Sequence, residues 1–257
     1  MNVVLSLAAA LLLMTAPTGA AQTAAGSSSP IVRSGLIYES APFPSAHAST
    51  IVSTKEGLVA AWFGGTREGA ADVGIWTARH VNGAWTAPTE VATGVQADGT
   101  RHPCWNPVLF ETSPGTLTLF YKVGPSPQRW WGMTRTSRDH GKTWSDATRL
   151  PDGILGPIKN KPVRLDDGTL LSPTSTESTE QPSKWRVYFE RSTDGGKTWT
   201  IVRPAEGAAI DAIQPSILVH PKNRLQAVGR SRSGRVFETW SEDGGKSWSA
   251  VACRKRP

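Results

Sequence analysis

The stretch "SRDHGKTWS" (Ser137–Ser145) returns twice along the chain, as "STDGGKTWT" (Ser192–Thr200) and "SEDGGKSWS" (Ser241–Ser249). All three share the form S-x-D-x-G-x-[TS]-W. An Asp in such a phrase can accept backbone N–H bonds within a tight turn, and the Gly supplies the dihedrals that the turn requires. The Trp can pack between neighbouring strands. We therefore interpret the phrase as scaffolding and expect the chemistry to lie elsewhere in each repeat.

The spacing of the repeats predicts the fold. The closing Trp recurs at Trp144, Trp199 and Trp248, and a degenerate copy, "TARHVNGAW", ends at Trp85. Ahead of each copy stand two apolar runs of strand length separated by a turn, then a third strand, and a short fourth strand follows the Trp. Four antiparallel strands in about 50 residues are typical of a β-propeller blade. We expect an all-β propeller with about four blades in this chain.

Composition agrees with this fold and narrows the ligand class. The 257 residues include 11 Trp, 25 Gly and 19 Pro, which favours a turn-rich all-β chain with one substantial core. The formal charge is +7, but Lys and Arg are scattered, so the sequence shows no nucleic-acid-binding stripe and favours a small anionic ligand. Cys104 and Cys253 have neither a disulfide-framework pattern nor metal-ligand spacing, so we expect no metal and no cofactor.

The N-terminus resembles an export signal. The apolar run Val3–Met14 is shorter than the roughly 20 residues that span a bilayer, and small residues for cleavage follow near Ala20 and Ala21. We predict a signal peptide at residues 1–21, a linker at 22–32 and an incomplete propeller domain at 33–257, with the protein secreted or periplasmic. A retained membrane anchor is the alternative. We expect no membrane span in the mature chain.

Propeller geometry indicates where a site would form. Connections into the first strand of each blade, and those from the second strand to the third, lie at one end around the central axis, opposite the repeated turns. Polar residues before the first strands are His47, Asn106, Lys159, Asn160, Lys161 and Gln214, with Trp105 beside them. Those after the second strands are Arg67, Glu68, Asp72, Lys122, Glu177, Arg230 and Arg232. Many cations, a few carboxylates and one His suit an anionic sugar.

Most of these residues also have structural interpretations. His47 can cap the entry to a strand, and Asp72 lies in "TREGAADVG", where a turn-forming Asp is common. Lys159 and Lys161 can be solvated, and one of Arg230 and Arg232 can be a rim charge. Trp130 and Trp131 can form a sugar-stacking platform or pack between blades.

The repeated phrase is the Asp-box, and the chain resembles the sialidase (BNR-repeat) superfamily over about residues 33–250. The segments "HASTIVSTKEGLVAAWFGGTREGAADVGIW", "CWNPVLF", "FYKVGPSP", "GILGPIKNKPV" and "IQPSIL" are similar to a bacterial sialidase-like or exo-α-sialidase subgroup. The resemblance implies a six-bladed propeller, of which this chain would hold about four blades and would be truncated at its C-terminus. A complete four-bladed ring is the alternative. The segment Gly35–Ser40 would then be the outer strand of a closing blade.

The resemblance also implies roles for individual residues. Asp72 matches the acid/base Asp of the family, and Arg230 matches the second of three arginines that bind the substrate carboxylate. His47 stands where the family has its first Arg, and Gln214 stands where a Glu would activate the Tyr nucleophile. The third Arg and the Tyr would lie beyond residue 257. Asp72 and Arg230 therefore support sialidase chemistry, whereas His47 and Gln214 depart from it.

Three functions follow from these residues. The first is an exo-acting enzyme on acidic glycans, an exo-α-sialidase, with Asp72 as the acid and Arg67, Lys122 and Arg230 holding the carboxylate. The second is a lyase or rhamnosidase acting at rhamnose–glucuronate links, with His47 transferring the proton and Gln214 orienting the sugar. The third is a glycan-binding propeller without catalysis. In each case the expected partner is an acidic glycan or sialoside, and nucleic acid is not expected.

Overall fold

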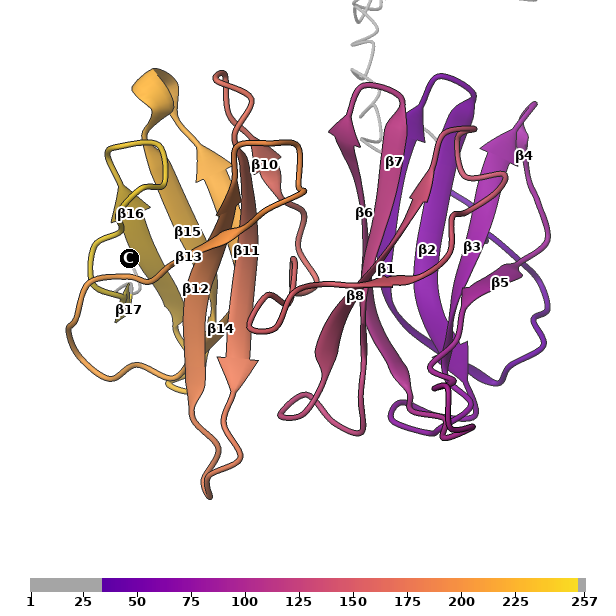
Figure 1. Cartoon of the computed structure of the whole chain (residues 1–257), viewed down its shortest axis with the longest axis horizontal. Coiled ribbons are helices and arrows are strands. Elements are labelled where there is room, and N and C mark those ends of the chain that lie inside the picture. Colours follow the sequence, from indigo (N-terminus) through magenta and orange to yellow (C-terminus); the bar gives the residue numbers. More distant parts are fainter. Residues whose placement is uncertain (1–33, 254–257) are drawn as a thin grey trace, which may run out of the picture. The chain divides into compact units, whose positions relative to one another are not determined.

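The structure is a computed structural model that describes residues 34–253, and the predicted signal peptide and linker lie outside these residues. Within them the chain forms four antiparallel sheets, and the strands of each sheet follow one another in sequence order, except that β5 (Thr89–Ala92) pairs with β3 (Gly74–Val81) (Figure 1). We call these sheets blades 1 to 4. The all-β propeller arrangement with four blades is confirmed.

Short turns connect the strands, as the hairpin pattern of the sequence predicts. Blade 1 contains β1 Ser45–Thr54, β2 Gly57–Gly65, β3 Gly74–Val81, β4 Ala84–Trp85 and β5 Thr89–Ala92. Blade 2 contains β6 Cys104–Ser113, β7 Thr116–Val123, β8 Trp131–Ser137 and β9 Thr148–Arg149. Blade 3 contains β10 Val163–Arg164, β11 Leu170–Glu177, β12 Trp185–Ser192 and β13 Thr200–Val202. Blade 4 contains β14 Ala212–Val219, the 3-10 turn η1 Pro221–Asn223, β15 Leu225–Ser231, β16 Val236–Ser241 and β17 Ala252–Cys253.

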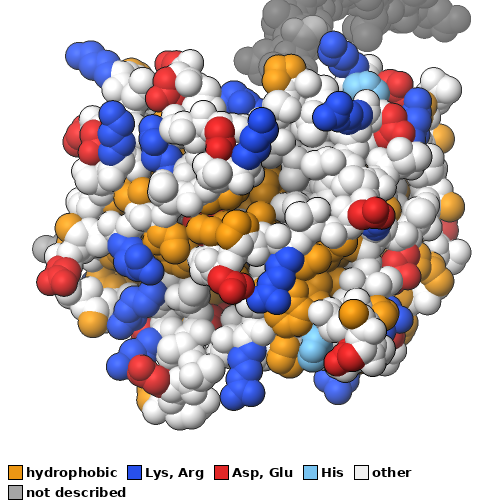
Figure 2. Space-filling view, in the orientation of Figure 1, with side chains coloured by type: hydrophobic (Ala, Val, Ile, Leu, Met, Phe, Trp, Pro, Cys, Tyr) orange, Lys and Arg blue, Asp and Glu red, His pale blue; other side chains and the backbone are white. Residues whose placement is uncertain are grey.

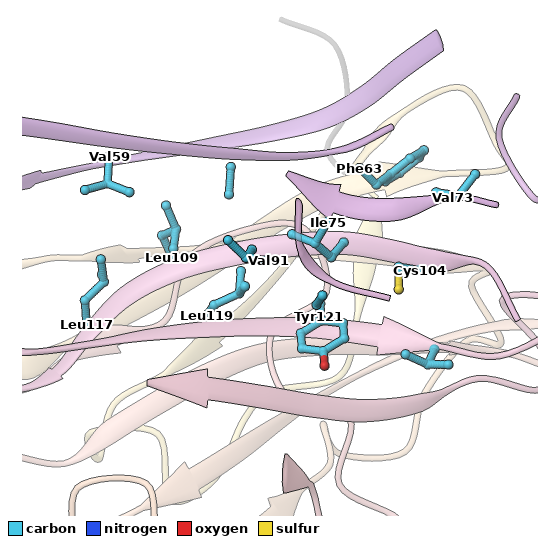
Figure 3. Packing of buried hydrophobic residues seen from close by; sticks show 13 residues of the cluster. Val59, Phe63, Val73, Ile75, Val91, Cys104, Leu109, Leu117, Leu119 and Tyr121 are labelled. Carbon is cyan, nitrogen blue, oxygen red and sulfur yellow. The ribbon is translucent and has the colours of Figure 1, made fainter. Parts of the chain in front are cut away.

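The main apolar core lies between blades 1 and 2. Side chains alternate along β2, so Val59, Ala61 and Phe63 all lie on one face of blade 1. They pack against residues of β6 and β7, including Leu109 and Leu119, in a cluster of buried side chains (Figure 3). Stacking of the two sheets therefore accounts for the long apolar runs in these strands.

The other face of blade 1 is covered by the chain that precedes β1. The Tyr38 ring stacks on Trp62 with the ring centroids 5.3 Å apart, and the Phe43 ring lies 4.8 Å from Trp76. The predicted strand at Gly35–Ser40 is wrong, because no strand forms there. Aromatic side chains pack on the blade face in its place, and the segment makes no ladder with a neighbouring strand.

The Asp-boxes form three turns with the same hydrogen bonds. In the first, Asp139 accepts from the Ser137 hydroxyl at 2.8 Å and from the Thr143 amide at 2.9 Å, and Ser137 accepts from the Gly141 amide at 2.8 Å. The boxes of Asp194 and Asp243 repeat this pattern. These contacts satisfy backbone donors within the turn, as the scaffolding interpretation requires.

The Trp of a box packs on the preceding blade. Trp248 of blade 4 stacks on Phe189 of blade 3, with the ring centroids 3.8 Å apart, and Trp199 of blade 3 contacts Phe120 of blade 2 edge to face. The degenerate copy in blade 1 has no Asp and turns through Asn82 and Gly83, both of which have positive φ. Asn-Gly is a preferred pair for such a two-residue hairpin, so blade 1 forms its turn without a box.

Candidate functional site at the axial end of the blades

A backbone irregularity recurs near the start of the innermost strand of each blade. The register with the next strand shifts between His47 and Thr50 in β1, between Trp105 and Val108 in β6, and between Ile213 and Ser216 in β14. One residue at each shift has positive φ, namely Ala48, Asn106 and Gln214. Lys159 has the same conformation just before β10. Positive φ is unfavourable for these residue types, and such strain clusters at functional sites.

Four polar side chains stand at these three bulges and at the positive-φ position before β10, and they are left without protein partners. The side chains of His47, Asn106, Lys159 and Gln214 make no hydrogen bond or ion pair within residues 34–253. Asn106 is the most enclosed of the four, at 8% exposed. A polar amide buried to this extent is usually satisfied. We call these four residues, one from the start of each blade, the mouth.

Aromatic rings form the wall of the mouth between blades 1 and 2. His47 meets the edge of Phe63 at 5.5 Å, Phe63 lies 6.3 Å from Trp105, and Trp105 lies 5.9 Å from Trp130. The Trp105 indole donates to the Gly124 carbonyl at 2.9 Å, which fixes its ring. The His47 ring is therefore held by its packing contact with Phe63 and not by a hydrogen bond.

The two consecutive tryptophans both take part in packing. Trp130 contacts Trp105, whereas Trp131 packs against the core between blades 1 and 2 and lies under the Arg149 guanidinium, 5.2 Å from its ring centre. Inter-blade packing therefore describes the contacts of Trp131, whereas Trp130 packs within blade 2.

Asp72 lies in the exposed loop between β2 and β3, together with Arg67 and Glu68. Its carboxylate accepts from the Thr66 hydroxyl at 2.6 Å and from the Thr66 amide at 2.9 Å. Because these hydrogen bonds favour the carboxylate, they lower the pKa of Asp72, and nearby Arg101 acts in the same direction. Asp72 is thus ionised at neutral pH, and a role as general acid requires a substrate that restores its proton.

Arg230 and Arg232 share one aromatic surface. Both guanidinium groups lie over Trp185 at the start of β12, 5.2 and 4.0 Å from its ring centre respectively. Arg232 also lies 4.0 Å from Asp211, whereas Arg230 makes no ion pair or hydrogen bond in the described chain. Arg230 is therefore the more available cation of the two. Trp185 and Asp211 were not among the predicted site residues. The position of Trp185 at the start of a predicted third strand is the feature of the sequence that could have indicated it.

Three of the predicted cations and amides are already bonded within the protein. Lys122 is 0% exposed and donates to the Pro157 carbonyl, a position that does not suit the predicted clamp on a substrate carboxylate. Asn160 donates to the carbonyls of Gln214 and Pro215 at 2.9 and 3.0 Å. These side chains join blades 2, 3 and 4.

Lys161 also joins blades. Its ammonium donates to the Leu109 carbonyl at 2.8 Å and to the Thr50 hydroxyl at 3.2 Å, which ties blade 3 to blades 2 and 1. Partial desolvation lowers its pKa to about 8. In the "KNK" stretch, Lys159 is the only one of the three whose side chain is free to meet a ligand within the described chain.

Glu177 is likewise engaged, because it accepts from the Trp185 indole at 3.3 Å and from Gln128 at 3.2 Å.

No group of three His, Cys, Asp or Glu side chains that could hold a metal ion occurs in residues 34–253. The mouth thus presents His47, two amides and the cations Lys159 and Arg230, with Asp72 near its rim. This arrangement can bind an anion, donate hydrogen bonds to hydroxyl groups and transfer a proton at one imidazole.

Comparison with known families agrees with the repeats and the blades. Residues 56–257 match a family described as a BNR repeat-like domain, and this match includes all three Asp-boxes. The chain belongs to the BNR repeat-like family. Its curated relatives place this BNR repeat-like protein among sialidase-like members. No helix of the described residues is long and apolar enough to cross a membrane.

The relatives are distant and longer. The chain is 29% identical over 125 residues to a sialidase of Bacteroides fragilis (strain YCH46), a match that covers 44% of this chain and 21% of the relative. It is 27% identical over 146 residues to an anhydrosialidase of Macrobdella decora, covering 52% and 18%. A Hadza microbial sialidase has a similar structure, with a TM-score of 0.65 at 17% identity over 79% of this chain and 46% of that one. At that identity the structural likeness shows the fold alone.

Proposed function

We propose that this protein is a glycoside-cleaving enzyme that acts at the ends of acidic glycans, and that exo-α-sialidase is its activity. The observation that carries the proposal is the set of unpaired polar side chains at three bulges and at the positive-φ residue before β10. A free protein that leaves His47, Asn106, Lys159 and Gln214 without partners has hydrogen-bonding capacity available for a polar ligand. The sialidases among its relatives support the same substrate class.

The charges of the mouth favour an anionic sugar. Lys159 and Arg230 make no ion pair in the described chain, and the ring of Trp185 beneath Arg230 holds its guanidinium in place. A sugar carboxylate would pair with these cations, and Arg can bind it through two parallel hydrogen bonds. Asn106 and Gln214 would then bind hydroxyl groups or an acyl amide of the sugar.

Asp72 is the first of two candidate residues for proton transfer, and His47 is considered with the second candidate function. Asp72 stands at the position of the family's acid, but its hydrogen bonds from Thr66 favour the ionised form. A bound glycan that displaces Thr66 and shields the carboxylate from water would raise its pKa and make it an acid. In this proposal Asp72 protonates the glycosidic oxygen while Lys159 and Arg230 hold the carboxylate.

A second candidate function is a His-dependent lyase or rhamnosidase acting at rhamnose–glucuronate links. It is favoured by His47, whose exposed ring contacts Phe63 but makes no hydrogen bond within the described chain. An imidazole is the side chain that most often serves as a general acid or base in catalysis. The sugar specificity would then rest on a uronate carboxylate at the same cations.

A third candidate, from a different class, is a non-catalytic glycan-binding propeller. The same mouth would bind the acidic sugar, but no group would need to transfer a proton.

We also propose secretion, on the basis of the apolar run Val3–Met14 and the small residues that follow it.

The deciding experiment compares His47→Arg with His47→Gln and Asp72→Asn in the full chain. The assays are release of sialic acid from 3′-sialyllactose and release of sugar or unsaturated uronate from a rhamnose–glucuronate oligosaccharide. The control is His220→Gln, because His220 stacks on Trp240 beside η1 at the opposite end of blade 4. We expect sialoside cleavage to survive His47→Arg and to be lost in Asp72→Asn.

Each other outcome selects one of the alternatives. Cleavage of the rhamnose–glucuronate substrate that is lost in both His47 variants would contradict the sialidase proposal and favour proton transfer by His47, because Arg does not release its proton at working pH. Binding of either sugar without any cleavage, unchanged in Asp72→Asn, would identify a binding module.

A further inference from the structure

A cavity lies at the outer edge of blade 3. It has a volume of about 650 Å³ and is lined by Tyr188 of β12, Ile201 of β13 and the linker from Arg203 to Ile210. β13 is the outermost strand of its sheet, whereas the mouth is built at the starts of the innermost strands. None of the mouth residues lines this cavity. It is therefore a separate site, which we call the outer cavity.

The outer cavity has the size and the apolar surface of a small-molecule site. Its volume falls within the roughly 300–1,000 Å³ that is typical of ligand pockets. Val187, Ile201, Ile210 and Val251 contribute apolar side chains from β12, β13 and the segments that flank blade 4. Figure 2 shows hydrophobic side chains gathered over β12 and β13, with Lys and Arg side chains beside them.

The lining of the outer cavity contains two guanidinium groups, Arg186 and Arg203, and one carboxylate, Glu206. Arg186 is paired with Asp211, whose carboxylate lies 2.9 Å from its guanidinium. Arg203 makes no hydrogen bond or ion pair within residues 34–253, and Glu206 is the only acidic residue among the lining side chains that the structure describes. Burial raises the pKa of Tyr188, so its phenol stays neutral at physiological pH. An available guanidinium thus stands beside apolar walls.

We propose that the outer cavity binds a small amphipathic anion, a carboxylate attached to an apolar chain or ring. The carboxylate would pair with Arg203, whose planar guanidinium can bind two oxygens at once. The apolar body would cover Ile201, Ile210 and Val187 and so remove their surface from water. Arg254, Lys255 and Arg256 follow in the sequence and have the same sign as Arg203, so they do not complement it.

Octanoate is the probe, because it has one carboxylate and an apolar chain. Calorimetric titration of the full chain is expected to give one saturable site for octanoate and weaker binding of 1-octanol, which has no charge. Arg203→Gln should weaken octanoate binding by about tenfold, since a charge-assisted hydrogen-bond pair is lost. Ala209→Trp should abolish it by filling the cavity. Arg138→Gln, in the Asp-box of blade 2, is the matched control and should bind octanoate as the parent chain does.

Several results would overturn the proposal. Octanoate binding that is absent, or equally strong in Arg203→Gln and Ala209→Trp, would show that no such site exists here. Equal affinity for 1-octanol and octanoate would show an apolar cavity without anion selectivity. Self-association that is lost only in Ala209→Trp would assign the cavity to a second copy of the chain. Melting curves of each variant establish that the fold is retained, and since no glycan is used, the outcome is independent of the proposed glycosidase activity.

Discussion

Lys122 and Glu190 are both fully buried between blades 2 and 3 and hold successive residues of the same linker. Glu190 accepts from the Leu155 and Gly156 amides at 2.7 and 2.8 Å, and Lys122 donates to the Pro157 carbonyl. The two charged residues therefore fix the segment that leads directly to Lys159 in the mouth. An ionisable pair in the interior is costly unless it is hydrogen-bonded, and here both members are bonded to backbone.

This pair predicts an unusual pH dependence of stability. Burial raises the pKa of Glu190 from 4.5 to about 7 and lowers the pKa of Lys122 from 10.5 to about 7. The folded Glu190 keeps a proton that the unfolded chain releases, so its contribution to the free energy of unfolding falls between about pH 4.5 and 7. The folded Lys122 releases a proton that the unfolded chain keeps, so its contribution rises between about pH 7 and 10.5.

We therefore expect the contribution of Glu190 and Lys122 to be smallest near neutral pH. In Glu190→Gln the free energy of unfolding should fall less between pH 5 and pH 7 than it does in the parent chain. Urea unfolding at pH 5, 6, 7 and 8 measures this difference. Glu180→Gln, an exposed residue paired with Lys184, is the control. An unchanged slope in Glu190→Gln would show that Glu190 titrates normally in the folded protein.

A second prediction concerns the hydroxyl group at the centre of an Asp-box. Ser137 is 2% exposed, accepts from the Gly141 amide and donates to Asp139. Ser137→Ala leaves a backbone donor in the turn without its partner and should lower the free energy of unfolding by about 1–3 kcal/mol. Ser49→Ala, on exposed β1, should have little effect in the same urea titration. Equal effects of the two variants would refute the structural role.

A third prediction concerns how the three Asp-boxes contribute to stability at acid pH. Hydrogen bonds from Thr143 and Thr198 hold the pKa values of Asp139 and Asp194 well below 3.8, and the pKa of Asp243 is also lowered. A lowered pKa in the folded state supplies stability above pH 3.8 that is lost as pH falls through the folded value. Asp194→Asn should therefore make the melting temperature less sensitive to pH between 4 and 2. A parallel decline in parent and variant would contradict this assignment.

A fourth prediction separates the two lysines of the "KNK" stretch. Lys161→Met should lower the melting temperature, because the Leu109 carbonyl and the Thr50 hydroxyl lose a donor that joins three blades. Lys159→Met should leave the melting temperature unchanged and should weaken binding of an acidic sugar, measured by titration with sialic acid or glucuronate. The reverse result, with Lys161 needed for binding and Lys159 for stability, would invert their roles.

The sequence by itself determined the fold and predicted where a site would lie. The Asp-box depends on contacts within nine residues, so its Ser, Asp, Gly and Trp positions indicate the turn without knowledge of the rest of the chain. The regular spacing of such turns then predicts blades, and the blade geometry places His47, Asn106, Lys159 and Gln214 at equivalent positions. Whether they bind and cleave a glycan stays a prediction.

Only the tertiary structure decided which polar residues are free. Asn160 and Lys161 lie in the same loop as Lys159, Lys122 lies near the end of β7, and no local pattern distinguishes the bonded side chains from the free one. Their ammonium and amide groups donate to carbonyl and hydroxyl oxygens that are 35 to 111 residues away in sequence. The segment Gly35–Ser40 likewise has a strand-like composition, but its one aromatic side chain, Tyr38, stacks on Trp62 on a blade face. Contacts between distant segments decide these cases, because burial and hydrogen bonding across blades outweigh local propensity.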